Sequence, residues 1–117
     1  MIAITEIAHR LASLCAEQKF VEAYTELFSD HAESTDPIYK NEPLKGLAQL
    51  IERERQFLST AEIHDIKVSE ALFAGNYFTV IIAMDFTVSG RERRKMEEIG
   101  VYKVENGKIV SQQFFIG

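Results

Sequence analysis

A chain of 117 residues, 46% of them hydrophobic, is long enough to bury its own core, and we expect a single domain over residues 1–117. The formal charge of −5 argues against a nucleic-acid partner, because phosphate binding needs a positively charged face. No apolar run approaches the roughly 20 residues that span a bilayer. Residues 1–6 also lack the basic start of a secretory signal. We therefore expect a cytoplasmic protein with no membrane partner.

The cysteine and histidine residues of this sequence do not indicate a metal site or a catalytic nucleophile. The single cysteine, Cys15, cannot form an internal disulfide, and the three histidines have no metal-ligand spacing, so we expect no metal site. Cys15 lies on the apolar side of a helical pattern, which predicts a buried side chain. No phosphate-binding loop or nucleophile elbow is present, which argues against nucleotide hydrolysis and serine hydrolase chemistry.

Apolar residues at three- and four-residue steps predict two helices in the first 30 residues. The first stripe is Ile4, Ile7, Ala8, Leu11, Leu14 and Cys15, and the second is Phe20, Tyr24, Leu27 and Phe28. The chain must leave the helix at Asp36, because Pro37 disfavours the α conformation in the residue before it. We expect a short strand or extended segment over residues 32–38.

A third helix is predicted after the loop at residues 41–46. Its apolar stripe is Leu47, Leu50, Ile51, Phe57 and Leu58, and Glu54 is an unusual acid within that stripe. From about residue 62 the pattern alternates, which predicts four antiparallel strands near 62–74, 77–88, 91–105 and 108–116. The turns between them contain Gly75-Asn76, Ser89-Gly90 and Asn106-Gly107. Helices followed by a meander of long strands predict an α+β fold with a strongly bent antiparallel sheet.

This layout resembles a known family. Two amphipathic helices, an Asp-Pro segment, a Gly-led helix and hairpin-joined strands ending in Asn-Gly-Lys-Ile-Val at residues 106–110 are similar to the SnoaL-like family of the nuclear transport factor 2-like superfamily. The likeness covers nearly the whole chain. It implies a cystatin-like cone with three N-terminal helices packed on a bent sheet. Such domains include ketosteroid isomerases, polyketide cyclases, dehydratases and epoxide hydrolases, and also non-catalytic transport and assembly domains.

Comparison with the ketosteroid isomerases sharpens the expectation. Asp36 matches their general base, which belongs to an Asp-Pro pair at the end of the first strand. Counting from the shared motifs, their hydrogen-bonding Tyr falls on Ala12 and their protonated Asp on Ile99 or Gly100. Both oxyanion donors are therefore missing by position, and ketosteroid isomerisation by that mechanism is not expected, because losing one donor commonly costs several kcal/mol.

The resemblance also implies the walls of a hydrophobic pocket. They are Arg53, Glu54 and Phe57 from the third helix, Ile82, Met84 and Phe86 from one strand, Glu98 and Tyr102 from the next, and Gln112, Phe114 and Ile116 from the last. The candidate catalytic residues are Asp36 and Glu54. Asp36 could act as a base or bind the amides of its own turn. Glu54 could share a proton with Asp36, or Arg53 could neutralise it. Glu98 could bind the ligand or pair with a basic side chain of a neighbouring strand.

Two functions remain open at this point. One is a cofactor-independent isomerase, cyclase or hydrolase that acts on a small apolar molecule through a carboxylate base. The other is a non-catalytic binding or dimeric association domain. The outer face of the sheet favours a homodimer, because apolar side chains there would otherwise face water. That face carries Tyr77, Thr79, Ile81, Ala83, Ile99 and Val101.

Overall fold

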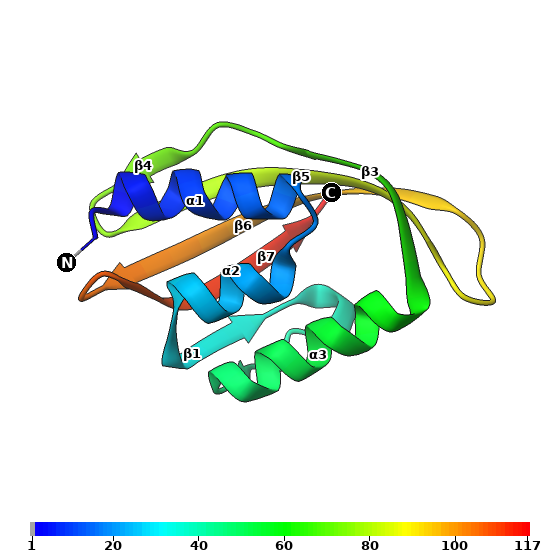
Figure 1. Ribbon diagram of the computed structural model, residues 1–117, viewed down its shortest axis with the longest axis horizontal. Helices are drawn as coiled ribbons and strands as arrows, with labels where there is room; N and C mark the ends of the chain where they lie inside the picture. Colours follow the sequence, from blue (N-terminus) through cyan, green and yellow to red (C-terminus); the bar gives the residue numbers. More distant parts are fainter. Residues whose placement is uncertain (1) are drawn as a thin grey trace.

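Three helices lie over one face of a seven-stranded sheet (Figure 1). The computed structural model describes residues 2–117. The helices are α1 (Ile4–Ala16), α2 (Phe20–Leu27) and α3 (Leu47–Thr60), and a 3₁₀ turn, η1, spans Pro37–Tyr39. The strands are β1 (Phe28–Thr35), β2 (Leu44–Lys45), β3 (Ala61–Val68), β4 (Leu72–Ala74), β5 (Tyr77–Val88), β6 (Arg94–Glu105) and β7 (Lys108–Ile116). Within this described part of the chain, no helix is long and apolar enough to cross a membrane.

The sheet order is β2-β1-β7-β6-β5-β3, with β4 also paired to β5, and the α+β class is confirmed. The predicted meander is present, because β5, β6 and β7 pair in antiparallel succession. The sheet is nevertheless mixed rather than wholly antiparallel, since β1 pairs with β7 in parallel. No hairpin joins these two strands, so the local turn pattern could not fix their relative direction.

Several element boundaries differ from those predicted. The second helix ends at Leu27 and a strand begins at Phe28, so only the first part of the expected extended segment 32–38 is strand. The expected strand 62–74 is interrupted after Val68. There the Ser69 hydroxyl accepts a hydrogen bond from the Ile81 amide at 2.7 Å and takes the place of a backbone carbonyl in the ladder. The third long strand begins at Arg94 instead of residue 91.

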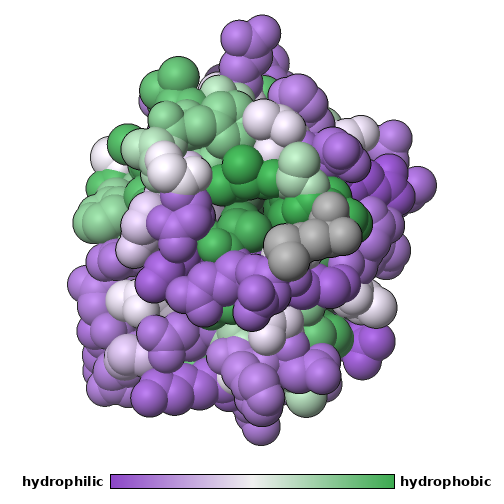
Figure 2. Space-filling view, turned by 90° about the vertical axis from the view of Figure 1, so that its left-hand side faces the viewer, coloured by the Kyte–Doolittle hydropathy of each residue, from purple (hydrophilic) through white to green (hydrophobic). Residues whose placement is uncertain are grey.

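The core lies between the helices and the inner face of the sheet. Ile7, Ala8 and Leu11 of α1 are buried, as the apolar stripe predicted. On β5 the alternate residues Phe78, Val80, Ile82, Met84 and Phe86 all face inward. Some apolar side chains stay outside this core: they gather at the end that carries the N-terminus and β4 (Figure 2), where Leu72 and Phe73 are exposed.

The packing of α1 on the sheet makes a direct prediction about stability. Ile7 has no exposed surface, so Ile7→Ala should lower the free energy of unfolding by about 3 kcal/mol through lost burial and a residual cavity. His9→Ala on the exposed side of the same helix is the control and should change it little. Urea denaturation measures both values. Equal effects of the two substitutions would contradict this packing.

Candidate functional site

A cavity of about 120 Å³ lies between the helices and the inner face of the sheet. Its walls contain side chains from all three helices, from the turn after β1 and from β5, β6 and β7. Of the residues named from the sequence, the structure places these on its wall: Asp36, Arg53, Glu54, Phe57, Ile82, Met84, Glu98, Tyr102, Gln112 and Phe114. The strand pairing brings them together, because Glu98 lies opposite Ile82 and Tyr102 lies beside Gln112.

Two expected wall residues, Phe86 and Ile116, do not line the cavity. Phe86 lies two residues beyond Met84 on β5, where its ring packs against Phe57 at a centroid distance of 5.8 Å and fills that end of the core. Ile116 is the last residue of β7, beyond Phe114 on the same face. Both side chains point to the inner side of the sheet, but the cavity ends before it reaches them.

The first two helices contribute more to the wall than the sequence indicated. Leu11, Cys15, Phe20, Ala23 and Tyr24 all line the cavity. Their helical stripes predicted burial, but a stripe cannot tell a packed neighbour from a void. Ala12, the positional match of the isomerase Tyr, is not on this wall; hydroxyl groups come instead from Tyr24 and Tyr102.

The Asp36 side chain caps a turn and also lines the cavity. Its Oδ1 atom accepts a hydrogen bond from the Ile38 amide at 2.9 Å and so caps the 3₁₀ turn that begins at Pro37. Its carbonyl oxygen accepts the amides of Tyr39 and Asn41. The side chain is only 9% exposed. The carboxylate is therefore held rigidly at the wall by its own turn.

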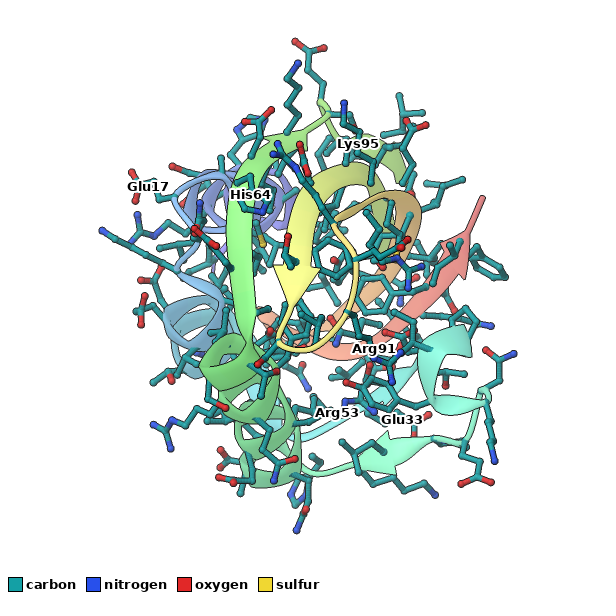
Figure 3. The ribbon with its side chains drawn as sticks, turned by 90° about the vertical axis from the view of Figure 1, so that its right-hand side faces the viewer. Glu17, Glu33, Arg53, His64, Arg91 and Lys95 are labelled. Atoms are coloured by element: carbon teal, nitrogen blue, oxygen red, sulfur yellow. The ribbon has the colours of Figure 1, made fainter. Side chains whose placement is uncertain are left out.

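Arg53 is the only cationic side chain of the described residues on the cavity wall, and its direct contacts are with Tyr39 and Ser34. It extends from α3 toward the segment after β1 (Figure 3). Its guanidinium carbon lies 4.1 Å from the centroid of the Tyr39 ring, and Nη2 donates a hydrogen bond to Ser34 Oγ at 3.2 Å. Within residues 2–117, neither Glu54 nor Glu98 forms an ion pair with it.

A chain of hydrogen bonds joins the far side of the cavity. Gln112 Nε2 donates to Tyr24 Oη at 2.7 Å and to Ser34 Oγ at 3.0 Å. Both amide hydrogens of Gln112 are thus used within the protein, so this residue holds Tyr24 in place more than it orients a ligand. Burial raises the pKa of the Tyr24 hydroxyl, which keeps its proton and can donate it in a hydrogen bond.

Glu54 and Glu98 have the most perturbed carboxyl groups of the site. Burial, and then the nearby Asp36 carboxylate, raise the pKa of Glu54 to about 7, although Arg53 opposes the shift. Burial, Asp36 and Glu54 together raise the pKa of Glu98 to about 7. A pKa close to neutrality suits a group that both accepts and gives a proton. No cluster of three potential metal ligands is present in the described part of the chain.

Tyr102 reaches toward Glu98 because residue 100 has no side chain. A Cβ atom at Gly100 would lie 2.7 Å from Tyr102 Oη and 2.8 Å from Cε2, closer than real contacts allow. The ring stacks on Phe78 with a centroid distance of 4.8 Å. Since Glu98, Gly100 and Tyr102 share one face of β6, the hydroxyl group leans over Gly100 toward the acid.

Comparisons with known proteins identify the family and the fold. A model of the SnoaL-like domain family matches residues 2–116. A search among curated proteins finds no match. A proposed SnoaL-like polyketide cyclase [carbohydrate phosphatase] from Mesorhizobium loti is 25% identical with a TM-score of 0.88, over 97% of this chain and 99% of that chain.

Two further solved structures share the fold at lower identity. One is a hypothetical protein from Catenulispora acidiphila with a ketosteroid isomerase-like fold, in complex with trimethylamine. It is 16% identical with a TM-score of 0.77, over 94% of this chain and 84% of that chain. The other is a protein of unknown function from Burkholderia xenovorans with the nuclear transport factor 2-like fold. It is 16% identical with a TM-score of 0.76, over 96% of this chain and 80% of that chain.

The two raised pKa values predict how stability depends on pH. Glu54 and Glu98 bind protons more tightly in the folded chain than in the unfolded chain, where the value is near 4.5. The stability that they contribute is complete below that value and is lost as the pH rises through about 7. The free energy of unfolding should therefore fall between about pH 5 and pH 8, by roughly 2 kcal/mol for each carboxyl group. Urea denaturation at stepped pH measures the fall.

Matched variants separate this effect from other titrations. Glu54→Gln and Glu98→Gln should each flatten the pH dependence and raise stability at about pH 8. Glu97→Gln is the control, because Glu97 is exposed and lies on the opposite face of β6. A wild-type stability that stays constant or rises over this range would contradict the burial of uncompensated carboxyl groups.

Proposed function

This chain belongs to the SnoaL-like domain family, and we propose that it is a small-molecule enzyme that moves a proton on a ligand held in the cavity. The reaction type is an isomerisation, cyclisation or hydrolysis that needs no cofactor. The observation that carries the proposal is the convergence of Glu54 and Glu98, both with a pKa of about 7, on one largely apolar cavity. Strongly shifted carboxyl groups in a concave site favour acid–base chemistry.

The two glutamates take the catalytic roles in this proposal. Near neutral pH one of the pair carries a charge while the other keeps its proton, because like charges in one site oppose simultaneous ionisation. The ionised carboxylate removes a proton from a carbon atom or from a water molecule. The neutral carboxyl group, or the hydroxyl group of Tyr24 or Tyr102, donates a hydrogen bond to the oxygen on which charge develops.

In this proposal Asp36 does not transfer a proton itself, and its negative charge instead raises the pKa of the two glutamates. Its Oδ1 atom already accepts the Ile38 amide. In this proposal Asp36 is a positioning residue that keeps one proton on the pair. The alternative, in which Asp36 itself is the base, predicts that Asp36→Asn abolishes turnover outright instead of shifting its pH profile toward lower pH.

The size of the cavity limits the ligand. A protein cavity of about 150 Å³ accommodates benzene, and this one measures about 120 Å³. A ligand with a single small ring or a compact branched frame therefore fits, whereas a polycyclic ligand would require the walls to open. The trimethylamine in the Catenulispora acidiphila relative is also a small, compact molecule, which supports this size range.

Proton transfer can be tested without knowing the natural substrate. Small cyclic ketones exchange their α-hydrogens with deuterated water when a base is positioned beside them, and proton NMR follows the exchange. We expect the wild type to accelerate exchange on cyclopentanone by about a hundredfold over buffer. Glu54→Gln or Glu98→Gln should remove most of this acceleration, whereas Glu97→Gln should retain it.

Binding must be measured beside the exchange. Met84 and Met96 line the cavity, so ¹³C-methyl labelling of the methionines reports occupancy by the ketone. Ketone binding without accelerated exchange would contradict the enzymatic proposal and support a non-catalytic binding domain. Failure of every small cyclic ketone to bind would rule out neutral carbonyl compounds of this size as substrates.

A second candidate function, dimeric association, is favoured by a different surface. Ile81 pairs with Ile99, and Ile99 pairs with Phe115, so the three side chains form a row across the outer face of the sheet. They are 45%, 43% and 51% exposed, respectively. An apolar row of this kind on a sheet face supports association with a second copy of the chain.

The dimer can be tested by mass in solution. Sedimentation equilibrium at micromolar concentration should give twice the 13.3 kDa of one chain. Ile99→Glu should yield the single chain, because the charge would be buried in the interface. Ile2→Glu is the control, since Ile2 is equally exposed but precedes α1. A wild type with the mass of one chain would rule out this association.

A further inference from the structure

We propose that the ligand of this cavity is a small organic cation, namely a protonated or quaternary amine on a compact hydrocarbon frame. This inference rests on the proposed function only in that the cavity binds a small molecule. It concerns the class of that molecule, which neither the fold nor the family determines. Three observations on different parts of the cavity support it: its excess of acids, its aromatic wall and a tyrosine hydroxyl group that faces the cavity with no hydrogen bond to the described residues.

The cavity has more negative than positive groups. Asp36, Glu54 and Glu98 lie on its wall, and Arg53 is the one cationic side chain that the described residues place there. That guanidinium is already engaged, because it lies over the Tyr39 ring and donates to Ser34. Every ion pair found in residues 2–117 lies outside the cavity. A ligand with a positive charge would supply the missing counter-charge, whereas an anionic ligand would meet repulsion.

The wall also suits the hydrocarbon part of such a cation. Phe28, Phe57 and Phe114 line the cavity together with Tyr24 and Tyr102. Aromatic faces attract alkylated ammonium groups through their quadrupole, and sites for quaternary amines commonly use several such rings with a nearby carboxylate. A purely apolar ligand would leave Glu54 and Glu98 without partners, which is costly in a buried site.

The third observation is the hydroxyl group of Tyr102. The Tyr102 residue is 2% exposed, its hydroxyl group is open to the cavity, and no hydrogen bond found among the described residues involves it. It lines the cavity and leans over Gly100 toward Glu98. A buried hydroxyl group normally has a partner. A ligand N–H or O–H donor located between Tyr102 Oη and the Glu98 carboxylate would provide one.

Binding of a cation would depend on pH in a specific direction. The charged or titratable groups that face the acids are Arg53, Cys15, Tyr24, Tyr39 and Tyr102. The raised pKa values of Cys15 and the three tyrosines keep them neutral below about pH 9. Glu54 and Glu98 are thus the groups that change charge near neutrality. Since a cation prefers the ionised carboxylates, its affinity should increase from about pH 6 to about pH 8, with release of protons.

The test compares choline with 3,3-dimethylbutan-1-ol, called dimethylbutanol below. This alcohol is the isostere of choline in which a carbon atom replaces the charged nitrogen. Both have the same shape, and the charge of choline does not change with pH. Isothermal titration calorimetry should show that choline binds at least about tenfold more tightly at about pH 8, with a smaller difference at about pH 6. Glu98→Gln and Glu54→Gln should each weaken choline binding by about tenfold and leave dimethylbutanol binding unchanged. Glu97→Gln should leave both unchanged.

The outcomes separate this inference from the proposed function. If dimethylbutanol binds as tightly as choline, or if cyclopentanone binds and choline does not, the cavity is a site for neutral molecules and the inference is overturned while the proposed function stands. If choline, dimethylbutanol and cyclopentanone all fail to shift the Met84 and Met96 methyl signals, the inference and the ligand-binding role fall together. Tighter choline binding that Glu98→Gln does not weaken would also overturn the inference.

Discussion

The candidate site depends on the burial of carboxyl groups in an apolar cavity where no cation forms an ion pair with them. A carboxylate in such a place loses hydration that the protein does not replace, so its protonated form is favoured. Glu54 and Glu98 are both in this situation, and Asp36 adds a like charge to each of them. The nearby Arg53 opposes the pKa shift of Glu54 without cancelling it, because its direct contacts are with Tyr39 and Ser34. Residues that burden the fold in this way are common at functional sites.

The fold brings these groups together by simple means. Helix α3 provides Glu54, the alternation of β6 provides Glu98, and the turn after β1 fixes Asp36. The absence of a side chain at Gly100 lets Tyr102 lean along the strand toward Glu98. Gln112 then links Tyr24 to Ser34 and so fixes the opposite wall. Most of the site is therefore built on regular elements, which hold their side chains more rigidly than loops do.

The sequence predicted the fold well where the residue pattern within one helix or strand was enough to identify that element and its buried face. Alternation over residues 77–88 identified the inner face of β5, and the acid at Glu54 was conspicuous within its apolar stripe. The prediction failed where two distant segments had to meet. The parallel pairing of β1 with β7, the place of Tyr24 beside the cavity and the end of the cavity before Phe86 and Ile116 all depend on tertiary packing. Counting positions from a relative's motifs placed Ala12 where the isomerases have a tyrosine, and it could not show that Tyr24 of α2 lines the cavity.

The most direct measurement is the titration of the two glutamate carboxyl groups themselves. Carbon-13 NMR of the side-chain carboxyl signals, assigned with Glu54→Gln and Glu98→Gln, follows each group in the folded protein. We expect both groups to titrate near pH 7, with Glu54→Gln lowering the midpoint of Glu98. Two midpoints near the ordinary value of 4.5 would show that the carboxyl groups are hydrated or neutralised, and would contradict the account.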